Sequence, residues 1–205
     1  VYTVAFKYIL GSKVEGFVFF LLLGILPWGF FVGSTNMATR SITDSPDLIK
    51  SVRFPRAVLP IATVLFNFAQ YGLTIVVFLP LMLVAQGVPL AAPMLLYPVF
   101  LGLQVLFTVG VAFVLAAGTV FFRDVRHLLE VALPILFWVT PIVYPLSQVP
   151  SPWRPLILLS PLSSYIVAYQ QIFYYRQWPD AEVWIIAIVY GFGALLVGMR
   201  FFLAL

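Results

Sequence analysis

The stretch that decides the fold runs from residue 57 to residue 122 and reads AVLPIATVLFNFAQYGLTIVVFLPLMLVAQGVPLAAPMLLYPVFLGLQVLFTVGVAFVLAAGTVFF. It contains no charged residue. A helix needs about 20 mostly apolar residues to cross the hydrocarbon core of a bilayer, so this stretch is too long for one span. Its centre, QGVPLAAP (86–93), supplies the glycine and prolines that break a helix. The sequence therefore predicts two membrane-spanning helices, at 57–85 and 94–122.

The composition of the whole chain agrees with a membrane protein. Of its 205 residues, 63% are hydrophobic and 9% are charged, whereas a soluble domain averages about 25% charged residues. The net charge of +4 is small and scattered, which argues against the dense basic face of a nucleic-acid-binding protein. The chain has no cysteine and a single histidine, His127, so we expect neither a disulfide scaffold nor a Cys- or His-rich metal site.

The same length criterion divides the rest of the chain. We expect an all-α membrane protein that forms a single domain over residues 1–205, with six helices of which the first is only partly present. The expected spans are 1–10 (partial), 17–37, 57–85, 94–122, 128–144 and 181–205. Because the chain begins with Val in an apolar run that lacks the basic start and cleavage site of a signal peptide, we expect it to be a fragment of a longer protein.

Two charged segments set the expected orientation. Basic residues gather in 38–56 and again in FFRDVRHLLE (121–130). Two spans separate these segments, so both lie on one side of the membrane, and their excess of Lys and Arg places that side in the cytoplasm. The loop at 86–93 and the proline-rich segment 145–180 then lie outside.

The sequence SPDLIKSVRF within the first charged segment carries the signals of a short amphipathic helix. Ser45 can cap it, Pro46 suits its first position, and Asp47 places negative charge at its positive end. Phe54 precedes Pro55 and therefore ends the helix. So short a helix is marginal alone, and we expect it to dock on a partner; the alternative is a solvated loop that only follows the positive-inside rule. The expected docking residues are Ser45, Pro46, Asp47, Leu48, Ile49, Lys50, Val52, Arg53 and Phe54.

Uncharged polar residues form a stripe along the expected helix 57–85. Four of them follow at i, i+4, i+7 and i+11, a spacing that puts them on one helical face, with a tyrosine beside them. Two further polar residues, spaced four apart, lie in the expected helix 94–122. Such side chains either form interhelical hydrogen bonds, worth about 0.6 kcal/mol each, or line a channel for an uncharged polar cargo such as a sugar. The channel-lining candidates are Thr63, Asn67, Gln70, Tyr71, Thr74, Gln104 and Thr108.

The segment TPIVYPLSQVPSPWRPLILLSP (140–161) is rich in proline, and no continuous helix tolerates that spacing. Irregular backbone at membrane depth occurs only where protein or a water-filled cavity covers it. We therefore expect short re-entrant helices within 145–180, on the outer side, placed to close a pathway; the alternative is an external loop on the membrane surface. The candidate residues of this outer gate are Thr140, Pro141, Tyr144 and Pro145.

The chain lacks the residues of an ion-coupled pump and of an ATPase. A pump usually needs an ionisable side chain at membrane depth, whereas Glu130 lies within a turn or two of the cytoplasmic end. The phosphate-binding pattern GxxxxGK[ST] is also missing. We therefore expect no enzyme activity on this chain, and we expect the energy for uphill transport to come from another polypeptide.

Four segments follow one another along nearly the whole chain: GILPWGFF (24–31), DLIKSVRFPRAVLP (47–60), VFFRDVRHLLEVALPILFWVTPIVYPLSQVP (120–150) and LSPLSSYI (159–166). Together they resemble the membrane subunit of ABC-2 type polysaccharide exporters, and the Phe-Arg-Asp and Thr-Pro-Ile-Val-Tyr-Pro elements are the most specific. The chain departs from the family pattern in lacking the amphipathic N-terminal helix, most of the first span and the charged cytoplasmic tail.

The resemblance implies a homodimer of six-helix subunits in the bacterial inner or plasma membrane, with a continuous channel between them. Two copies of an ATP-binding subunit would hold ATP and Mg²⁺, this chain itself would need no cofactor, and the helix at 45–54 would lie in a groove of that partner. The implied cargo is O-antigen, teichoic acid or capsular polysaccharide linked to undecaprenyl diphosphate.

Charged residues near the cytoplasmic entrance are candidates for binding the diphosphate, because guanidinium forks match phosphate oxygens. The alternative is that they only fix topology and contact lipid headgroups. The candidates are Arg40, Arg53, Arg56, Arg123 and Arg126. Asp124, of the Phe-Arg-Asp element, belongs to the same region as an expected contact at the second cytoplasmic loop.

Two other functions stay open at this point. An ABC-2 exporter of a small hydrophobic molecule or drug would lack a long polar conduit. A channel or carrier that works without ATP would need no nucleotide-binding partner.

Overall fold

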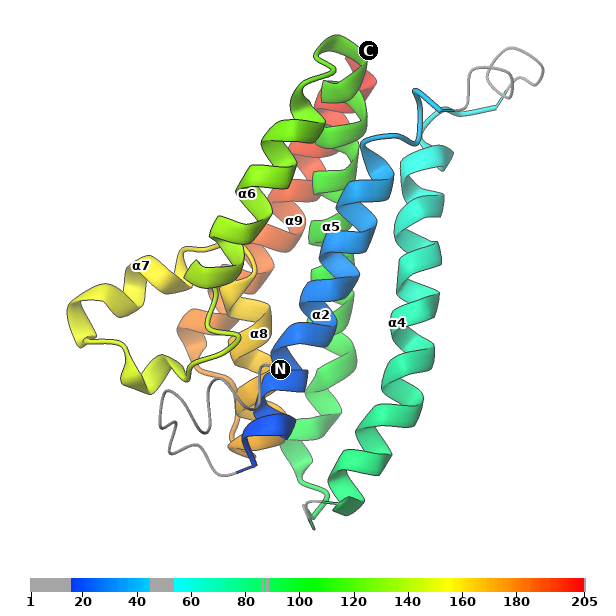
Figure 1. Ribbon diagram of the computed structural model, residues 1–205. Helices are drawn as coiled ribbons and strands as arrows, with labels where there is room; N and C mark the ends of the chain where they lie inside the picture. Colours follow the sequence, from blue (N-terminus) through cyan, green and yellow to red (C-terminus); the bar gives the residue numbers. More distant parts are fainter. Residues whose placement is uncertain (1–15, 45–53, 86, 88, 205) are drawn as a thin grey trace.

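The computed structural model describes residues 16–44, 54–85, 87 and 89–204, and these residues form helices joined by loops, with no strand among them (Figure 1). The expected all-α architecture is therefore confirmed for the described part of the chain. The helices are α2 (Phe17–Ala38), α4 (Val58–Ala85), η2 (Ala92–Leu96), α5 (Tyr97–Phe121), α6 (Val125–Val139), η3 (Leu146–Gln148), η4 (Ser151–Trp153), α7 (Arg154–Leu158), α8 (Ser163–Tyr169), the π-helix η5 (Gln170–Tyr174) and α9 (Ala181–Leu203).

Four helical segments are long and apolar enough to cross a membrane: α2, α4, η2 together with α5, and α9. They correspond to four of the six expected spans, with ends that differ by a few residues. The expected partial span 1–10 lies outside the described residues, as does 45–53, most of the expected cytoplasmic helix. The count of six helices therefore stays a prediction.

The helix expected at 128–144 is shorter and shifted in the structure. α6 has 15 residues, roughly 22 Å at about 1.5 Å per residue, which is less than the roughly 30 Å of a hydrocarbon core. Thr140 ends it in an extended conformation, with φ −78° and ψ 134°, because Pro141 disfavours the α region for the residue before it. Ile142, which the expected helix would include, follows the end of α6 and is fully buried.

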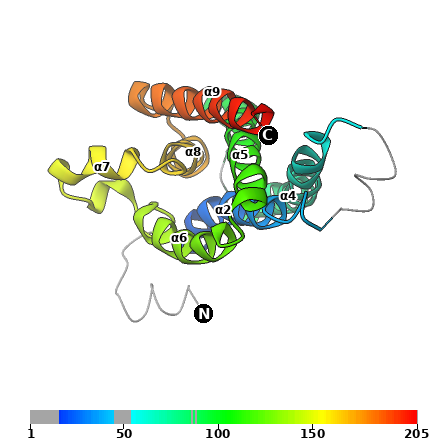
Figure 2. The same ribbon diagram turned by 90° about the horizontal axis from the view of Figure 1, so that it is seen from above.

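α5 lies at the centre of the bundle. It contacts α2, α4, α6, α8 and α9, and Figure 2 shows these helices around it. α5 and α9 approach most closely, because a Cβ atom on Gly110 would overlap the backbone of Ala194 and one on Gly198 would overlap the carbonyl of Gly110. Small residues allow this close packing of membrane helices. α5 and α9 therefore form a closely packed pair, and α2, α4, α6 and α8 pack around α5.

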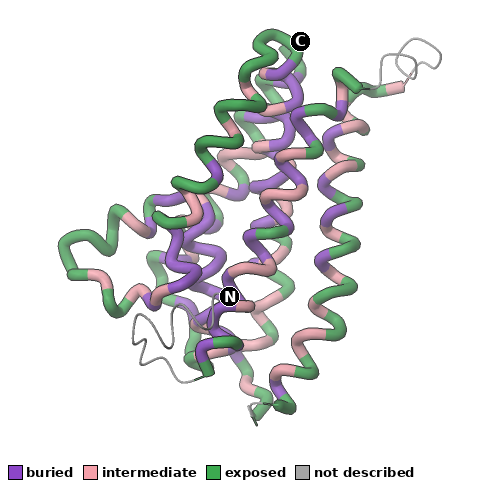
Figure 3. The backbone as a smooth tube through the Cα atoms, viewed as in Figure 1, coloured by how far each residue is buried: buried purple, intermediate pink, exposed green. Residues whose placement is uncertain are grey.

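α4 lies at the edge of the bundle. In its most apolar window 11% of the residues are buried, against 61% for α2, and Figure 3 shows mostly exposed and half-buried residues along it. Gly33 permits its contact with α2, since a Cβ atom there would overlap the side-chain oxygen of Asn67. α4 thus presents a long apolar face to lipid or to another membrane chain.

The described parts of the two charged segments lie at the same end of the molecule, in agreement with the prediction. Residues 39–44, residues 54–57, the α5–α6 turn and the C-terminal end of α9 lie at the top of Figure 1, and the α4–η2 turn lies at the bottom. This arrangement is the one expected if the charged end faces the cytoplasm.

α7 and α8 form a sharply bent arm. Ser151–Leu158 and Ser163–Tyr174 meet at 107°, and Figures 1 and 2 show α7 pointing away from the bundle while α8 lies within it. Such a bend fits either a broken span or a re-entrant loop. The expected re-entrant helices on the outer side therefore stay a prediction.

Candidate functional site

The polar stripe of α4 divides into a buried part and an exposed part. Asn67 and Tyr71 are buried, whereas Gln70 and Thr74 are exposed. Asn67 donates from Nδ2 to the carbonyl of Thr63 at 2.8 Å, and Thr74 donates to the carbonyl of Gln70 at 3.0 Å. Asn67 Nδ2 also lies 3.1 Å from Met37 Sδ of α2. These polar groups are thus satisfied largely within α4, and Asn67 adds a contact to the neighbouring helix.

A hollow of about 180 Å³ between α2 and α4 gathers most of this stripe. Phe30 of α2 stacks on Tyr71 at its wall, with ring centroids 5.6 Å apart. The structure therefore brings several predicted channel-lining residues to one surface, together with aromatic rings and an open stretch of α2. The hollow is lined by Leu26, Gly29, Phe30, Asn67, Gln70, Tyr71 and Thr74.

Gln104 and Thr108, in contrast, lie fully buried inside the subunit. Gln104 donates from Nε2 to the carbonyl of Pro27 at 3.0 Å and accepts at Oε1 from the hydroxyl of Tyr169 at 2.7 Å, which joins α2, α5 and α8. Thr108 donates to the carbonyl of Gln104 at 2.7 Å. The bonds of Gln104 are those of the interhelical alternative, whereas Thr108 is satisfied within α5 itself, and neither residue reaches an open surface of this subunit.

Two residues of the expected outer gate, Thr140 and Tyr144, close the end of α6. The hydroxyl of Thr140 donates to the carbonyl of Leu136 at 2.7 Å. The hydroxyl of Tyr144 folds back and donates to the carbonyl of Val139 at 2.9 Å, one of the last-turn carbonyls that lack a donor within the helix. The side chains that follow α6 therefore cap it.

The same segment also ties the end of α6 to η5, which continues α8, and to α2. Gln170 donates from Nε2 to the carbonyl of Pro141 at 2.7 Å. A Cβ atom on Gly24 of α2 would lie 3.0 Å from Ile142 Cγ2, so the turn after α6 is in close contact with α2 there. Pro145 is buried as well. Thr140, Pro141, Tyr144 and Pro145 thus form an anchor at the base of the α7–α8 arm.

The charged candidates at the expected cytoplasmic end are all exposed: Arg40, Arg56, Arg123, Asp124 and Arg126. Arg126 Nε lies 3.4 Å from Glu130 Oε1, an exposed pair of the kind that contributes little stability. Arg56 borders an apolar hollow of about 300 Å³ between the start of α4 and the ends of α5 and α9. The structure brings these residues to one end of the molecule, but not into one pocket.

The docking residues expected between 45 and 53, including Arg53, lie outside the described residues, and Phe54 is half-buried. Within the described part of the chain, no group of three or more His, Asp or Glu side chains is placed to hold a metal ion.

Known proteins match the chain over most of its length. Residues 1–174 match the protein family described as ABC-2 type transporter. The chain belongs to this family. An O-antigen export system permease protein RfbA of Myxococcus xanthus is 37% identical over 187 residues, which are 89% of the chain and 70% of that relative. Two proteins of the same name come from Klebsiella pneumoniae. One is 26% identical over 202 residues, which are 98% of the chain and 78% of that relative. The other is 27% identical over 173 residues, which are 84% of the chain and 67% of that relative.

Membership of the ABC-2 family confirms the resemblance drawn from the four segments. It also makes the chain a multi-pass integral membrane protein of the bacterial inner membrane, in agreement with its apolar helices. The family implies an ATP-binding partner subunit. The family match extends across 1–15 and 45–53, the segments that the structure does not describe.

Two tyrosines outside the sequence-based candidates, Tyr97 and Tyr169, continue the polar contacts of this ABC-2 subunit. The hydroxyls of Tyr71 and Tyr97 lie 3.0 Å apart, and the ring of Tyr97 packs edge-on against Tyr169 with centroids 5.3 Å apart. A tyrosine in a buried apolar run is itself a signal, because its hydroxyl needs a partner. Which helix supplies that partner does not follow from sequence spacing.

Proposed function

We propose that this ABC-2 permease is the transmembrane subunit of an ATP-driven exporter that carries lipid-linked polysaccharide from the cytoplasm across the bacterial inner membrane. The observation that carries the proposal is the 37% identity to an O-antigen export permease over 89% of the chain, supported by two more relatives of that name. The proposed cargo is an O-antigen, teichoic acid or capsular glycan on undecaprenyl diphosphate.

The proposed energy source is a separate ATP-binding subunit, present in two copies and carrying ATP and Mg²⁺, because this chain has no phosphate-binding loop. The segment 45–54 is the proposed contact with that subunit. It connects the end of α2 to the start of α4, so a displacement of this segment would act on both helices.

The proposed channel forms between two copies of this subunit. The hollow between α2 and α4 supports a polar wall, because the exposed side chains of Gln70 and Thr74 offer an amide and a hydroxyl beside aromatic rings. The anchor formed by Thr140, Pro141, Tyr144 and Pro145 is the proposed base of an outer gate, with the α7–α8 arm as its moving part.

The proposed entry site for the diphosphate is the charged end of the molecule. Arg40, Arg56, Arg123 and Arg126 are exposed there, and each guanidinium can pair with phosphate oxygens through two parallel hydrogen bonds. Asp124 stands at the N-terminal boundary of α6, within the Phe-Arg-Asp element that leads into this helix.

The experiment that tests this function uses a strain without the permease gene, complemented with the permease and its ATP-binding subunit. Wild-type protein is expected to restore glycan on the cell surface and to prevent accumulation of the lipid-linked glycan inside. Export that survives ATP depletion would contradict an ATP-driven mechanism and favour a channel or carrier. Export of a small hydrophobic compound without export of glycan would favour the drug-exporter alternative.

The docking segment is tested in the same strain. Replacing Leu48 and Ile49 together by Asp is expected to abolish export and glycan-stimulated ATP hydrolysis, because the apolar face of the helix is lost, while the amount of permease in the membrane stays unchanged. Thr43→Asp, at an exposed position before the segment, is the control. Normal export by the double variant would contradict the coupling role.

A further inference from the structure

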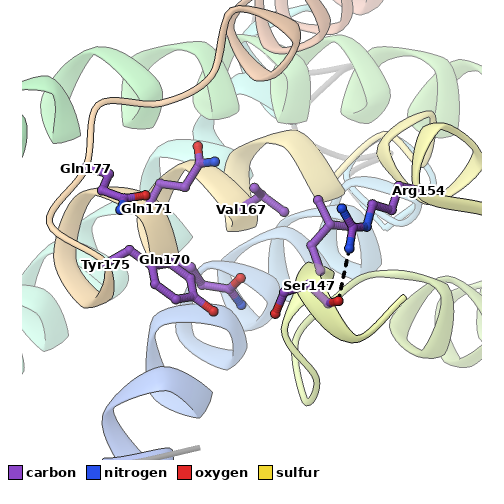
Figure 4. Close-up of a pocket in the computed structure, with 8 residues that line it drawn as sticks. Ser147, Arg154, Val167, Gln170, Gln171, Tyr175 and Gln177 are labelled. Atoms are coloured by element: carbon purple, nitrogen blue, oxygen red, sulfur yellow. Dashed lines mark hydrogen bonds between the residues drawn. The ribbon is translucent and has the colours of Figure 1, made fainter. Parts of the chain in front are cut away.

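A polar pocket lies beside the α7–α8 arm. Its volume is about 270 Å³, slightly below the roughly 300–1,000 Å³ typical of pockets for drug-sized ligands, so it suits one small ligand. Figure 4 shows Arg154 and Ser147 on one side and Gln171, Gln177 and Tyr175 on the other. The pocket is lined by Leu146, Ser147, Arg154, Val167, Gln170, Gln171, Tyr175 and Gln177.

Arg154 is held by the backbone through one edge of its guanidinium. Its Nε donates to the carbonyl of Val149 at 2.9 Å, and its Nη2 donates to the carbonyl of Ser147 at 3.0 Å. Because a guanidinium has five N–H groups, both protons of Nη1 and one of Nη2 remain, and this edge can bind a carboxylate with two parallel hydrogen bonds. No carboxylate among the described residues pairs with Arg154.

The amides on the opposite side are also positioned to bind a ligand. Gln171 donates from Nε2 to Asp180 Oδ2 at 2.6 Å and accepts from the backbone N–H of Asp180 at 3.3 Å. Asp180 stands at the N-cap of α9, where the helix dipole offsets its negative charge. The side-chain amide of Gln177 has no hydrogen-bond partner among the described residues, so it is available to a ligand. Amides both donate and accept, as sugar hydroxyls do.

We propose that this pocket binds one acidic sugar residue, a hexuronate, of the glycan as it leaves the channel. The carboxylate lies against the free edge of Arg154, the hydroxyls meet the amides of Gln171 and Gln177, and the ring lies beside Tyr175. The inference rests on the proposed function, because the proposed topology places the segment that carries the pocket on the outer side, where the glycan emerges.

The test uses the complete permease with its ATP-binding subunit in lipid nanodiscs. Saturation-transfer NMR measures binding of methyl glucuronide and of methyl glucoside, its neutral counterpart. We expect the glucuronide to bind about tenfold more tightly, as a single charge-assisted contact provides, and its binding to weaken as salt rises. Equal affinity for the two sugars, or no binding of the glucuronide, overturns the proposal.

Two variants locate the site. Arg154→Gln is expected to weaken glucuronide binding about tenfold with little change for the glucoside. Gln177→Ala is expected to weaken both sugars severalfold, and it retains the fold because this amide makes no hydrogen bond within the described residues. Gln148→Ala, at an exposed position of η3 outside the pocket, is the control. Unchanged glucuronide binding in Gln177→Ala overturns the proposal even where Arg154→Gln fails to fold.

Export of the native glycan is measured with the same proteins, so that failure of the pocket proposal can be distinguished from failure of the proposed export function. A wild-type transporter that exports glycan but binds no glucuronide overturns the pocket inference alone. One that exports no glycan overturns the proposed function, and the assignment of the pocket to an emerging glycan is overturned with it.

Discussion

At the scale of single residues, glycines decide how closely the helices of this subunit approach. Gly198 lies where α9 touches the backbone of α5, whereas a Cβ atom added at Gly193, five residues earlier on the same helix, would have no neighbour within 4 Å. Both are glycines in an apolar helix, so the sequence does not distinguish them. The backbone contact with Gly110 does, because it leaves no room for a Cβ atom.

This difference predicts opposite outcomes for two matched substitutions. Gly198→Leu is expected to destabilise the subunit by about 1–3 kcal/mol or more, since overpacking forces the helices apart. Gly193→Leu is expected to change stability by less than about 0.5 kcal/mol, as is usual at open surface positions. Unfolding of the purified permease in mixed micelles measures both, and equal destabilisation by the two substitutions would show that the α5–α9 contact is not backbone to backbone.

The buried pair of Gln104 and Tyr169 supports a second prediction at this scale. Tyr169→Phe removes one interhelical hydrogen bond and is expected to cost about 0.6 kcal/mol, with roughly 1.7 kcal/mol as the upper end. Gln104→Leu also removes the bond to Pro27 and is expected to cost more. In a double-mutant cycle the two substitutions should couple, because they share one bond. Strictly additive losses would mean that this hydrogen bond does not form.

At the scale of elements, the end of α6 shows how one proline changes a span. Hydrophobicity alone favours a helix that continues through 128–144, yet Pro141 holds Thr140 in an extended conformation. The chain then turns inward, and Tyr144 and Gln170 hydrogen-bond to carbonyls at the turn. Backbone geometry and local hydrogen bonds therefore outweigh apolar length at this position.

Pro141→Ala is accordingly expected to let α6 extend past Thr140, to draw Ile142 away from Gly24 and to reduce export severalfold by loosening the anchor of the α7–α8 arm. Hydrogen exchange measures the extension as new protection of the amides at 142–144. Pro134→Ala removes a proline inside α6 and leaves the helix end in place, so it is the control. An unchanged exchange pattern at 142–144, where both proteins carry amide protons, would contradict an α6 end set by Pro141.

At the scale of the whole molecule, the sequence predicts where the membrane spans lie better than it predicts which helices or surfaces each span contacts. Four spans follow from apolar length, because lipid requires every backbone polar group to be paired within the helix. The polar stripe is different. Helical spacing predicts that Gln70 and Gln104 each lie on a polar face of their helix. In the structure Gln70 is exposed, whereas Gln104 is buried between helices. Whether a polar face meets lipid, a channel or another helix depends on packing between segments that are distant in sequence.

The orientation of the whole molecule in the membrane gives the last prediction. The chain has no cysteine, so a single introduced cysteine is a unique label. Leu90, before η2, and Phe122, in the α5–α6 turn, are 85% and 71% exposed, and these turns lie at opposite ends of the bundle (Figure 1). Because basic residues gather at the Phe122 end, a membrane-impermeant maleimide applied from outside the inner membrane is expected to label Leu90→Cys. Phe122→Cys is expected to react only after that membrane is opened. The reverse pattern would mean an inverted subunit, and labelling of both sites from outside would mean that η2 and α5 do not cross the membrane as one span.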